Sequence, residues 1–340
     1  MKRFVILLAM LVVVAACGAE SSSGTASTDP PTSTSLSIEP STPPTSLAPE
    51  ATSVDSTSNT EAETGMYPLT VASPVGDLTI EQKPESILSL SPAATEMLFA
   101  IGAGDQVVAV DSLSNFPPEA PVTDLAAFTP NVEAILEFEP DLVVASFDPG
   151  ELASGLGAAG VPVLFQFSAV TLDDVYSQIE QLGLVTGSIA GAAELNSDLQ
   201  QRIATVVESM PEFEEPPTYY HELDPTYFTA TSATFIGEIY GLLGLANIAD
   251  AADPDGEFFG FPQLSEEFIL EADPDFVFLA DTKCCDATAA TVAARPGWSG
   301  LAAVMGANVV ELDDDVASRW GPRIVDYLEQ VAAAVAESVG

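Results

Sequence analysis

The sequence predicts an α/β fold in which two similar lobes, each built on a parallel central sheet, are joined by a helical connection. Three observations predict this fold: a gapless internal repeat, short apolar strands that alternate with helical segments, and a helical stretch with few breakers between the two copies. The folded part is expected to begin only after a leader and a long tether.

Residues 1–17 form an export leader. A basic start at 2–3, an apolar run over 4–14 and two small residues precede Cys17. The apolar run has about half of the roughly 20 residues that a membrane-spanning helix needs, so we expect the leader to be cleaved. Its last four residues, Val-Ala-Ala-Cys, resemble the lipobox of bacterial lipoproteins, which implies an extracytoplasmic protein held at the outer face of the cell membrane by a lipid on Cys17. The alternative is an ordinary signal peptide followed by a chance cysteine.

Residues 18–66 are dominated by Ser, Thr, Pro, Ala and acidic residues, with few large aliphatics. Such a segment cannot bury a core, so we expect a disordered tether that its prolines stiffen. The rest of the chain is long enough for two medium domains. We expect an N-terminal lobe over 67–187, a linker helix over 188–210 and a C-terminal lobe over 211–340.

The chain is strongly acidic, with a formal net charge of −43 and 51 acidic residues against 8 basic ones. Nucleic acid is excluded as a partner, because a phosphate backbone is held by clustered Lys and Arg. The acidity itself is typical of a solvated, self-repelling surface. Because cations are rare, each one is informative, and Arg319 and Arg323 lie close together in the sequence.

The internal repeat aligns residues 131–145 with 265–279 without a gap, an offset of 134 residues. Each copy predicts a short helix opened by a capping residue, a Pro-Asp turn and a continuously apolar strand. A weaker echo pairs 96–102 with 238–244, each an apolar helix that ends at a glycine. Both lobes are therefore expected to contain the same structural unit.

In the N-terminal lobe, short apolar segments alternate with helical ones, as in a parallel sheet. The expected strands are 86–90, 107–110, 142–145 and 161–165. A helix is expected to start at Pro92, since proline at the first helical position loses no hydrogen bond. Helices over 172–186 and 189–210 follow, and the second is expected to join the lobes. A helix of some twenty residues spans about 30 Å and limits how far the lobes can close.

Six motifs carry a family resemblance: SLSPAATE at 89–96, NFPPEA at 115–120, NVE at 131–133, PDLV at 140–143, FPQLS at 261–265 and GPRI at 321–324. The chain is similar to the solute-binding proteins that deliver cobalamin, ferric siderophores or haem to ABC importers. The resemblance covers nearly everything after Leu78 and implies two Rossmann-like lobes, a rigid linker helix and a ligand cleft between the lobes. It also implies a monomer without cofactor, whose partners are a membrane permease and a small metal chelate.

The resemblance assigns docking on the importer to one carboxylate on each lobe, which meets arginines of the permease. These positions match Glu133 and Glu267. The internal repeat places the same two residues at equivalent points of the two lobes, as a pseudo-symmetric protein would present them to a two-fold partner. The alternative is that they are ordinary exposed glutamates near helix starts.

The ligand-contacting residues that the resemblance implies are two aromatic positions and a polar pair. Phe128 and Phe261 lie at or next to positions where cobalamin binders place tryptophans, and Asp315 and Arg319 match a polar pair that contacts the ligand. Trp320 is a further candidate. Aromatic faces suit a flat macrocycle or a catecholate, and a guanidinium can stack on such a face or pair with its carboxylates or amides. For each of these residues the alternative is core packing.

Tyr220 is another ligand candidate, on the expected first strand of the C-terminal lobe. Its neighbour His221 is the only histidine, so a metal site built from several imidazoles is excluded and no metal site is expected. Cys284 and Cys285 are adjacent, and outside the cell such a pair either forms a strained vicinal disulfide or stays as two thiols.

Two other classes of function compete with solute binding. An extracellular enzyme on the same scaffold is disfavoured, because the sequence has no G-x-S-x-G elbow, Walker loop or dinucleotide fingerprint. A surface-anchored haem-binding or sensory module without an importer stays open. Among importer ligands, an iron-siderophore and a cobalamin-type chelate are both retained, although so acidic a protein repels anionic chelates and favours a neutral one.

Overall fold

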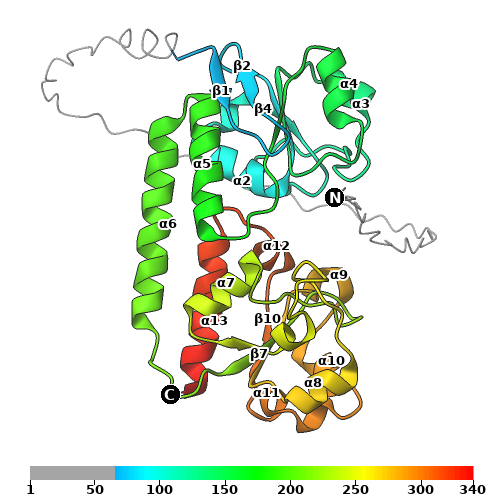
Figure 1. Cartoon of the computed structure of the whole chain (residues 1–340), viewed down its shortest axis with the longest axis vertical. Coiled ribbons are helices and arrows are strands. Elements are labelled where there is room, and N and C mark those ends of the chain that lie inside the picture. Colours follow the sequence, from blue (N-terminus) through cyan, green and yellow to red (C-terminus); the bar gives the residue numbers. More distant parts are fainter. Residues whose placement is uncertain (1–65, 340) are drawn as a thin grey trace, which may run out of the picture. The chain divides into compact units, whose positions relative to one another are not determined.

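The computed structural model describes residues 66–339, which all belong to one compact unit, Asp55–Gly340 (Figure 1). The expected leader, the lipidation site Cys17 and nearly all of the expected tether lie outside the described residues. Among the helices of the described part, none is long and apolar enough to cross a membrane.

The N-terminal lobe contains a parallel sheet with the strand order β4–β3–β5–β6. Its strands are β3 (Ile87–Leu90), β4 (Val107–Val110), β5 (Leu142–Ala145) and β6 (Val163–Phe165). The connecting helices are α2 (Pro92–Ala100), η1 (Gly104–Gln106), α3 (Val132–Leu136) and α4 (Leu152–Ala158). An antiparallel pair, β1 (Leu69–Val71) and β2 (Leu78–Ile80), precedes the sheet.

The C-terminal lobe repeats this arrangement with the strand order β10–β9–β7–β8, again with all pairs parallel. Its strands are β7 (Thr218–Glu222), β8 (Ala246–Asn247), β9 (Phe276–Leu279) and β10 (Val309–Glu311). Its helices are α7 (Phe235–Leu242), η2 (Ile248–Ala252), α8 (Glu266–Ala272), α9 (Thr282–Cys285), α10 (Ala289–Ala293), η3 (Trp298–Gly300), α11 (Ala302–Met305), α12 (Asp314–Ala317) and α13 (Ile324–Val339). The predicted α/β fold with two parallel sheets is confirmed.

The sequence repeat corresponds to α3–β5 in one lobe and α8–β9 in the other. Asn131 and Ser265 cap the two helices, because their side chains accept hydrogen bonds from free backbone N–H groups of the first turn. The aspartate of each Pro-Asp turn also makes a contact outside its own unit. Asp141 accepts from the backbone N–H of Ser86, and Asp275 accepts from that of Thr218. In each lobe an aspartate just before one strand, β5 or β9, is therefore bonded to the start of the neighbouring strand, β3 or β7.

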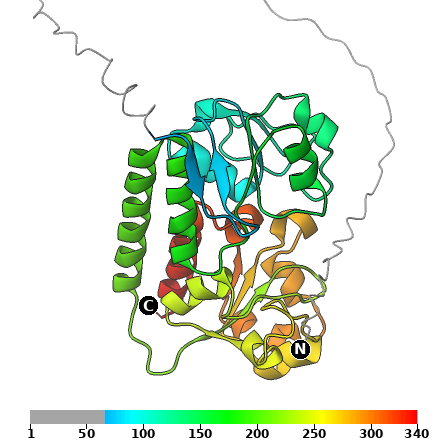
Figure 2. The same ribbon diagram turned by 45° about the horizontal axis from the view of Figure 1, so that its top comes forward.

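Two helices connect the lobes, α5 (Leu172–Thr186) and α6 (Ile189–Ser209), and they lie side by side (Figure 2). Gly187 ends α5 with a φ of 77°, a left-handed conformation that glycine adopts without strain. The helix expected over 189–210 is confirmed as α6, which reaches α13 of the C-terminal lobe, where Arg202 binds Asp326 and Glu329.

The largest apolar cluster extends over both lobes and their connection. It includes Met97 of α2, Ile179 of α5, Leu199 of α6, Tyr240 of α7 and Leu328 of α13, all nearly or fully buried. Full burial of one large apolar side chain stabilises a fold by about 1.5–3 kcal/mol. Because α5, α6 and α13 share this cluster, the helical connection is packed into the core and is not a free hinge.

Candidate functional site

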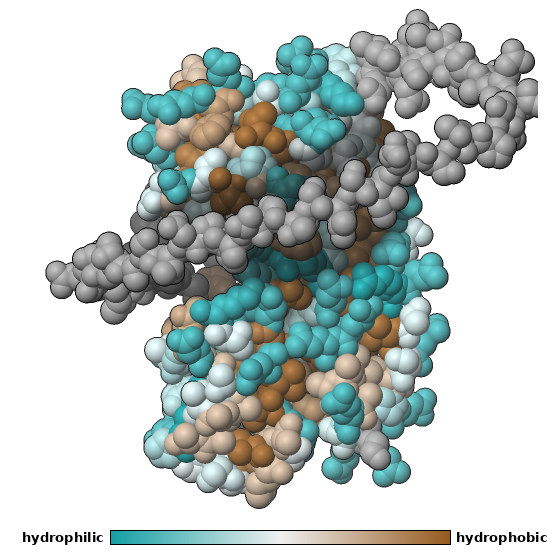
Figure 3. All heavy atoms as spheres, turned by 180° about the vertical axis from the view of Figure 1, so that it is seen from behind, coloured by the Kyte–Doolittle hydropathy of each residue, from teal (hydrophilic) through white to brown (hydrophobic). Residues whose placement is uncertain are grey.

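The polar residues of interest lie where the parallel strands end. In sheets of this kind the carboxyl ends of the strands form the ligand-binding edge. Asp111 follows β4, Glu222 ends β7, Asp281 follows β9, and the segment 312–323 follows β10. Seen from behind, the described surface is hollowed between the lobes (Figure 3).

Arg319 makes four hydrogen bonds, three of which join the two lobes. Its Nη1 donates to Glu96 at 3.1 Å and to Asn115 at 2.9 Å, both in the N-terminal lobe. Its Nη2 donates to the carbonyl oxygen of Leu113 at 2.9 Å and to Asp315 at 2.6 Å. The structure thus brings together the predicted polar pair of Asp315 and Arg319, but as an ion pair between themselves.

Glu96 lies at the centre of this network. Its carboxylate is almost fully buried and also accepts from Nε of Arg323 at 2.9 Å and from its Nη2 at 2.5 Å. Burial opposes the charge of Arg323, but the hydrogen bonds and charge of Glu96 prevail and raise the pKa of that guanidinium. The guanidinium carbon of Arg323 lies 4.2 Å from the centre of the Phe116 ring, a cation–π contact.

Lys283 extends the network on the C-terminal side. Its Nζ contacts Asp313 at 2.6 Å and Asp315 at 2.8 Å. The three cations Lys283, Arg319 and Arg323 are therefore all paired with carboxylates. Their positive charges are thus balanced by carboxylates of the protein itself.

Cys284 and Cys285 are joined in a disulfide within the short helix α9. The carboxylate of Asp314 accepts from the backbone N–H groups of Thr282, Lys283 and Cys284, which anchors the first turn of α9 to α12. The disulfide is exposed and directly follows Lys283, so it borders the charged network.

The predicted aromatic residues occupy different environments. Phe128 is 65 % exposed, and its ring centre lies 5.3 Å from that of Phe147. Phe261 is half-buried against the central core. Trp320 is also half-buried, packs edge-on against Phe235 at 6.0 Å, and donates from Nε1 to Gln178 of α5 at 3.0 Å. Phe128, and to a smaller extent Phe261 and Trp320, therefore keep surface for a ligand.

Two exposed aromatic residues were not predicted from the sequence. Phe258 and Phe259 are 52 % and 79 % exposed, on a loop just before Phe261. Asp253 holds this loop through hydrogen bonds from the backbone N–H groups of Phe258 and Gly260. The Asp-Pro-Asp-Gly turn at 253–256 was the signal that could have identified a loop presenting the two rings.

Tyr220 is placed in the core, not at a binding surface. It is fully buried and packs edge-on against Trp298 at 6.3 Å. The physical reason is its strand: β7 is central in a sheet covered on both faces, so side chains pointing to either side are buried. His221, on the opposite face, bonds through Nδ1 to the hydroxyl of Tyr240 at 2.7 Å, and burial lowers its pKa to about 3.

A second charged group lies inside the C-terminal lobe. Arg295 donates to both oxygens of Glu222 at 2.6 Å, and its guanidinium carbon lies 4.6 Å from the ring centre of Trp298. Asp281 is buried beside them, and burial together with the charge of Glu222 raises its pKa to about 7. The sequence did not link Arg295 to Glu222, because the two residues are 73 positions apart.

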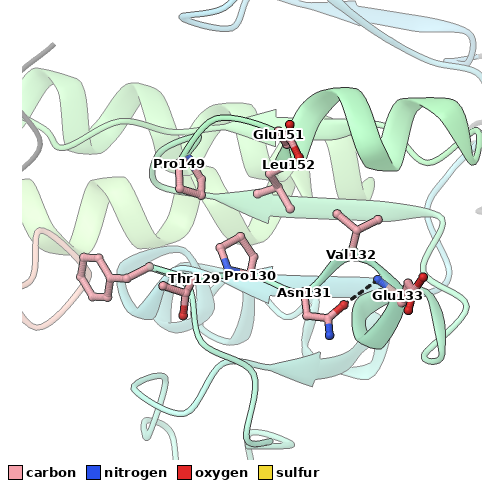
Figure 4. A pocket seen from close by; sticks show the side chains of 9 residues that line it. Thr129, Pro130, Asn131, Val132, Glu133, Pro149, Glu151 and Leu152 are labelled. Atoms are coloured by element: carbon pink, nitrogen blue, oxygen red, sulfur yellow. Dashed lines mark hydrogen bonds between the residues drawn. The ribbon is translucent and has the colours of Figure 1, made fainter.

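The two expected docking residues are exposed at the starts of equivalent helices. Glu133 is the second residue of α3, and its backbone N–H donates to Asn131 at 3.0 Å. It lines a pocket of about 670 Å³ together with Glu151 and Phe128 (Figure 4). Glu267 is the second residue of α8 and is likewise exposed.

Within residues 66–339, no group of three or more His, Cys, Asp or Glu side chains is arranged to hold a metal ion.

Comparison with known sequences gives a consistent result. The family described as "Periplasmic binding protein" matches residues 87–316. The "Uncharacterized ABC transporter substrate-binding lipoprotein YvrC" of Bacillus subtilis is 28 % identical over 82 % of this chain and 88 % of its own length. The "Cobalamin-binding protein" of Halobacterium salinarum is 33 % identical over 76 % of this chain and 71 % of its own length.

Solved structures agree with this result. The vitamin B12 binding protein BtuF of Vibrio cholerae is 29 % identical, with a TM-score of 0.61 over 75 % of this chain and 98 % of that one. A protein of an Fe³⁺-hydroxamate transport system from Saccharomonospora viridis is 26 % identical, with a TM-score of 0.64 over 79 % of this chain and 99 % of that one. The haem binding protein HutB of Vibrio cholerae is 25 % identical, with a TM-score of 0.65 over 74 % of this chain and 98 % of that one.

Proposed function

The chain belongs to the periplasmic binding protein family, and on this premise we propose that it captures a metal chelate without net negative charge, of the cobalamin type, for an ABC importer. The family itself is non-catalytic, and its members are extracytoplasmic solute-binding proteins that serve a membrane permease. The proposal concerns the identity of the chelate, since a vitamin B12 binding protein, a haem binding protein and a protein of an Fe³⁺-hydroxamate transport system share this fold.

The balanced charge of the cluster around Arg319 carries the proposal. Lys283, Arg319 and Arg323 are each paired with carboxylates, in a chain whose net charge is −43. An anionic siderophore or the propionates of haem would have to displace one of these carboxylates within a negative field. Cobalamin presents amides instead, whose N–H groups can donate to the carboxylates of this cluster without displacing a charge. The exposed ring of Phe128 and the half-buried Trp320 offer faces for a flat macrocycle.

Isothermal titration calorimetry with cyanocobalamin, haemin and a ferric catecholate siderophore, whose complex is anionic, tests the proposal. We expect cyanocobalamin to bind with a dissociation constant of about 1 μM or lower, a typical threshold for a specific small-molecule site. Haemin and anionic siderophores should bind more weakly. Tight binding of an anionic chelate without binding of cyanocobalamin would overturn the assignment to a neutral chelate, and binding of none would overturn the metal-chelate function.

We also propose that Glu133 and Glu267 dock the protein on its permease. Both are exposed, and they occupy equivalent positions in the two lobes. Replacing both by lysine should abolish uptake while cyanocobalamin binding persists. Glu137 and Glu271 give a matched control, because they are exposed, lie near the opposite ends of the same two helical segments and are also 134 residues apart. Equal loss of uptake in the control pair would argue for a general effect of surface charge.

Cys17 is proposed as the lipid anchor, with residues 18–66 as the tether. The support is the Val-Ala-Ala-Cys motif after the apolar run and the likeness to a substrate-binding lipoprotein. Replacing Cys17 by serine should release the protein from the membrane fraction and remove labelling by a radioactive fatty acid. Retention of the label in the variant would contradict the assignment.

A further inference from the structure

Two guanidinium groups from one lobe converge on a single buried carboxylate of the other. Glu96 lies on α2, and its side chain is 1 % exposed. Arg319 and Arg323 come from the short connection between α12 and α13, more than 220 residues later in the chain. Charge-assisted hydrogen bonds to a buried carboxylate are among the stronger polar contacts in proteins, and the fork of arginine gives them a defined geometry.

The connection 318–323, called the clamp segment here, is shaped to approach α2 closely. A side chain at Gly321 would place its Cβ 3.1 Å from Oε2 of Glu96 and 3.6 Å from the carbonyl oxygen of Ala93. Trp320, the neighbouring residue, donates to Gln178 of α5. The clamp segment therefore contacts two helices outside its own lobe, α2 and α5.

Arg319 is held in place by four hydrogen bonds within the protein. The guanidinium has five N–H donors, and the four on Nη1 and Nη2 are used by Glu96, Asn115, Leu113 and Asp315. These partners hold the orientation of Arg319 before any ligand arrives. Binding that uses a side chain already held in place loses less conformational entropy than binding that must first order it.

We propose that Glu96 is a positioning residue, which clamps residues 318–323 of the C-terminal lobe onto the N-terminal lobe and thereby fixes Arg319 and Trp320 for ligand capture. The clamp itself is inferred from the hydrogen bonds that Glu96 accepts from Arg319 and Arg323. Only its effect on affinity rests on the proposed function, because that part requires a chelate bound between the lobes.

Trp320 provides a direct readout of the clamp without any ligand. The chain has two tryptophans, of which Trp298 is fully buried in the C-terminal lobe and Trp320 lies in the clamp segment. In Arg323→Gln, the emission of Trp320 should shift to longer wavelength and become more accessible to acrylamide. The long-wavelength emission should disappear in the double variant Arg323→Gln/Trp320→Phe. This loss would identify Trp320 as the source of the shifted emission.

Arg202→Gln is the matched control. It also removes one guanidinium that pairs with carboxylates, but this guanidinium is 38 % exposed and its partners, Asp326 and Glu329, both lie on α13 of the C-terminal lobe. Tryptophan emission should not change in this variant. A shift equal to that of Arg323→Gln would show that any lost ion pair loosens the fold, and the clamp would be rejected.

Arg323→Lys covers the case in which Arg323→Gln does not fold. Lysine keeps the positive charge beside Glu96 but cannot form the two-pronged contact, so a smaller shift in the same direction is expected. Folding is checked by far-ultraviolet circular dichroism. Unchanged Trp320 emission in the folded Lys variant would overturn the proposal.

The effect on affinity is measured with cyanocobalamin as the probe. We expect Glu96→Gln and Arg323→Lys to weaken binding by about tenfold, because ligand-contacting side chains would then have to be ordered on binding, whereas Arg202→Gln should leave it unaltered. Weaker binding without a change at Trp320 would contradict positioning. If the unaltered protein does not bind cyanocobalamin, the proposed function fails, while the ligand-free emission still decides whether the clamp exists.

Discussion

The two lobes share a topology but differ in what they place at the ends of their strands. In the N-terminal lobe, Asp111 is buried and is held by the backbone N–H of Leu113 at 2.7 Å and by the hydroxyl of Ser114 at 3.1 Å. In the C-terminal lobe, Glu222 and Asp281 are buried together and share Arg295 as their nearby cation. At these strand ends, Asp111 of the N-terminal lobe accepts neutral hydrogen bonds, whereas Glu222 of the C-terminal lobe is paired with a guanidinium.

The apolar cores of the two lobes also differ in composition. The N-terminal cluster around β3 and β5 is nearly all aliphatic, whereas the C-terminal lobe packs aromatic rings such as Tyr219 on Tyr240 at 3.9 Å and Phe276 on Phe278 at 5.7 Å. A repeated backbone therefore does not require a repeated interior. At the strand ends, the C-terminal group of Glu222, Asp281 and Arg295 is therefore expected to be more sensitive to pH and to loss of charge than Asp111.

The largest expected effect comes from Arg295→Gln. Glu222 would stay fully buried without its cation, and breaking a buried ion pair in this way costs about 3–5 kcal/mol. The free energy of unfolding is measured by urea denaturation. In the N-terminal lobe, Ser114→Ala removes one hydrogen bond from Asp111 and should cost about 1–3 kcal/mol. Equal costs at the two sites would erase the proposed difference between the lobes.

The next effect is a pH dependence of the free energy of unfolding, which arises from Asp281. Burial and the charge of Glu222 raise its pKa to about 7, so the folded protein keeps a proton that the unfolded chain loses near pH 4. Where the folded state binds more protons, stability falls as pH rises, here between about pH 4 and pH 7.

Asp281→Asn removes this titration. Relative to the unaltered protein, the variant should gain stability progressively from pH 4 to pH 8, by a few kcal/mol, because each pKa unit corresponds to about 1.4 kcal/mol. The difference between the two proteins isolates Asp281 from His221, whose lowered pKa of about 3 acts in the opposite sense below about pH 6.5. A difference that stays constant with pH would contradict the assignment.

The smallest expected effect is that of the substitution Tyr220→Phe on ligand binding. Because Tyr220 is fully buried in the core of its lobe, Tyr220→Phe should leave the dissociation constant for cyanocobalamin unchanged. Phe128→Ala, which removes a ring that is 65 % exposed, should weaken binding. Calorimetric titration of both variants checks the pair, and a weaker affinity in Tyr220→Phe would make that residue a candidate ligand contact again.

The sequence by itself determined the architecture. The repeat at 131–145 and 265–279 predicted α3–β5 and α8–β9, and helical spacing predicted α5 and α6 nearly to the residue. These features are local: a capping side chain, a Pro-Asp turn and a run of apolar residues act over a few positions, so they can be recognised without knowing what packs against them.

Only the tertiary structure decided the partners of the charged residues and the exposure of the aromatic ones. Glu96 lies 223 residues from Arg319, and no periodicity links two positions that meet through the packing of separate lobes. Tyr220 is buried and Phe259 exposed because one is on a central strand covered on both faces and the other on a loop outside the sheet. Charge pairing and burial depend on which distant surfaces meet, and that is decided when the chain folds.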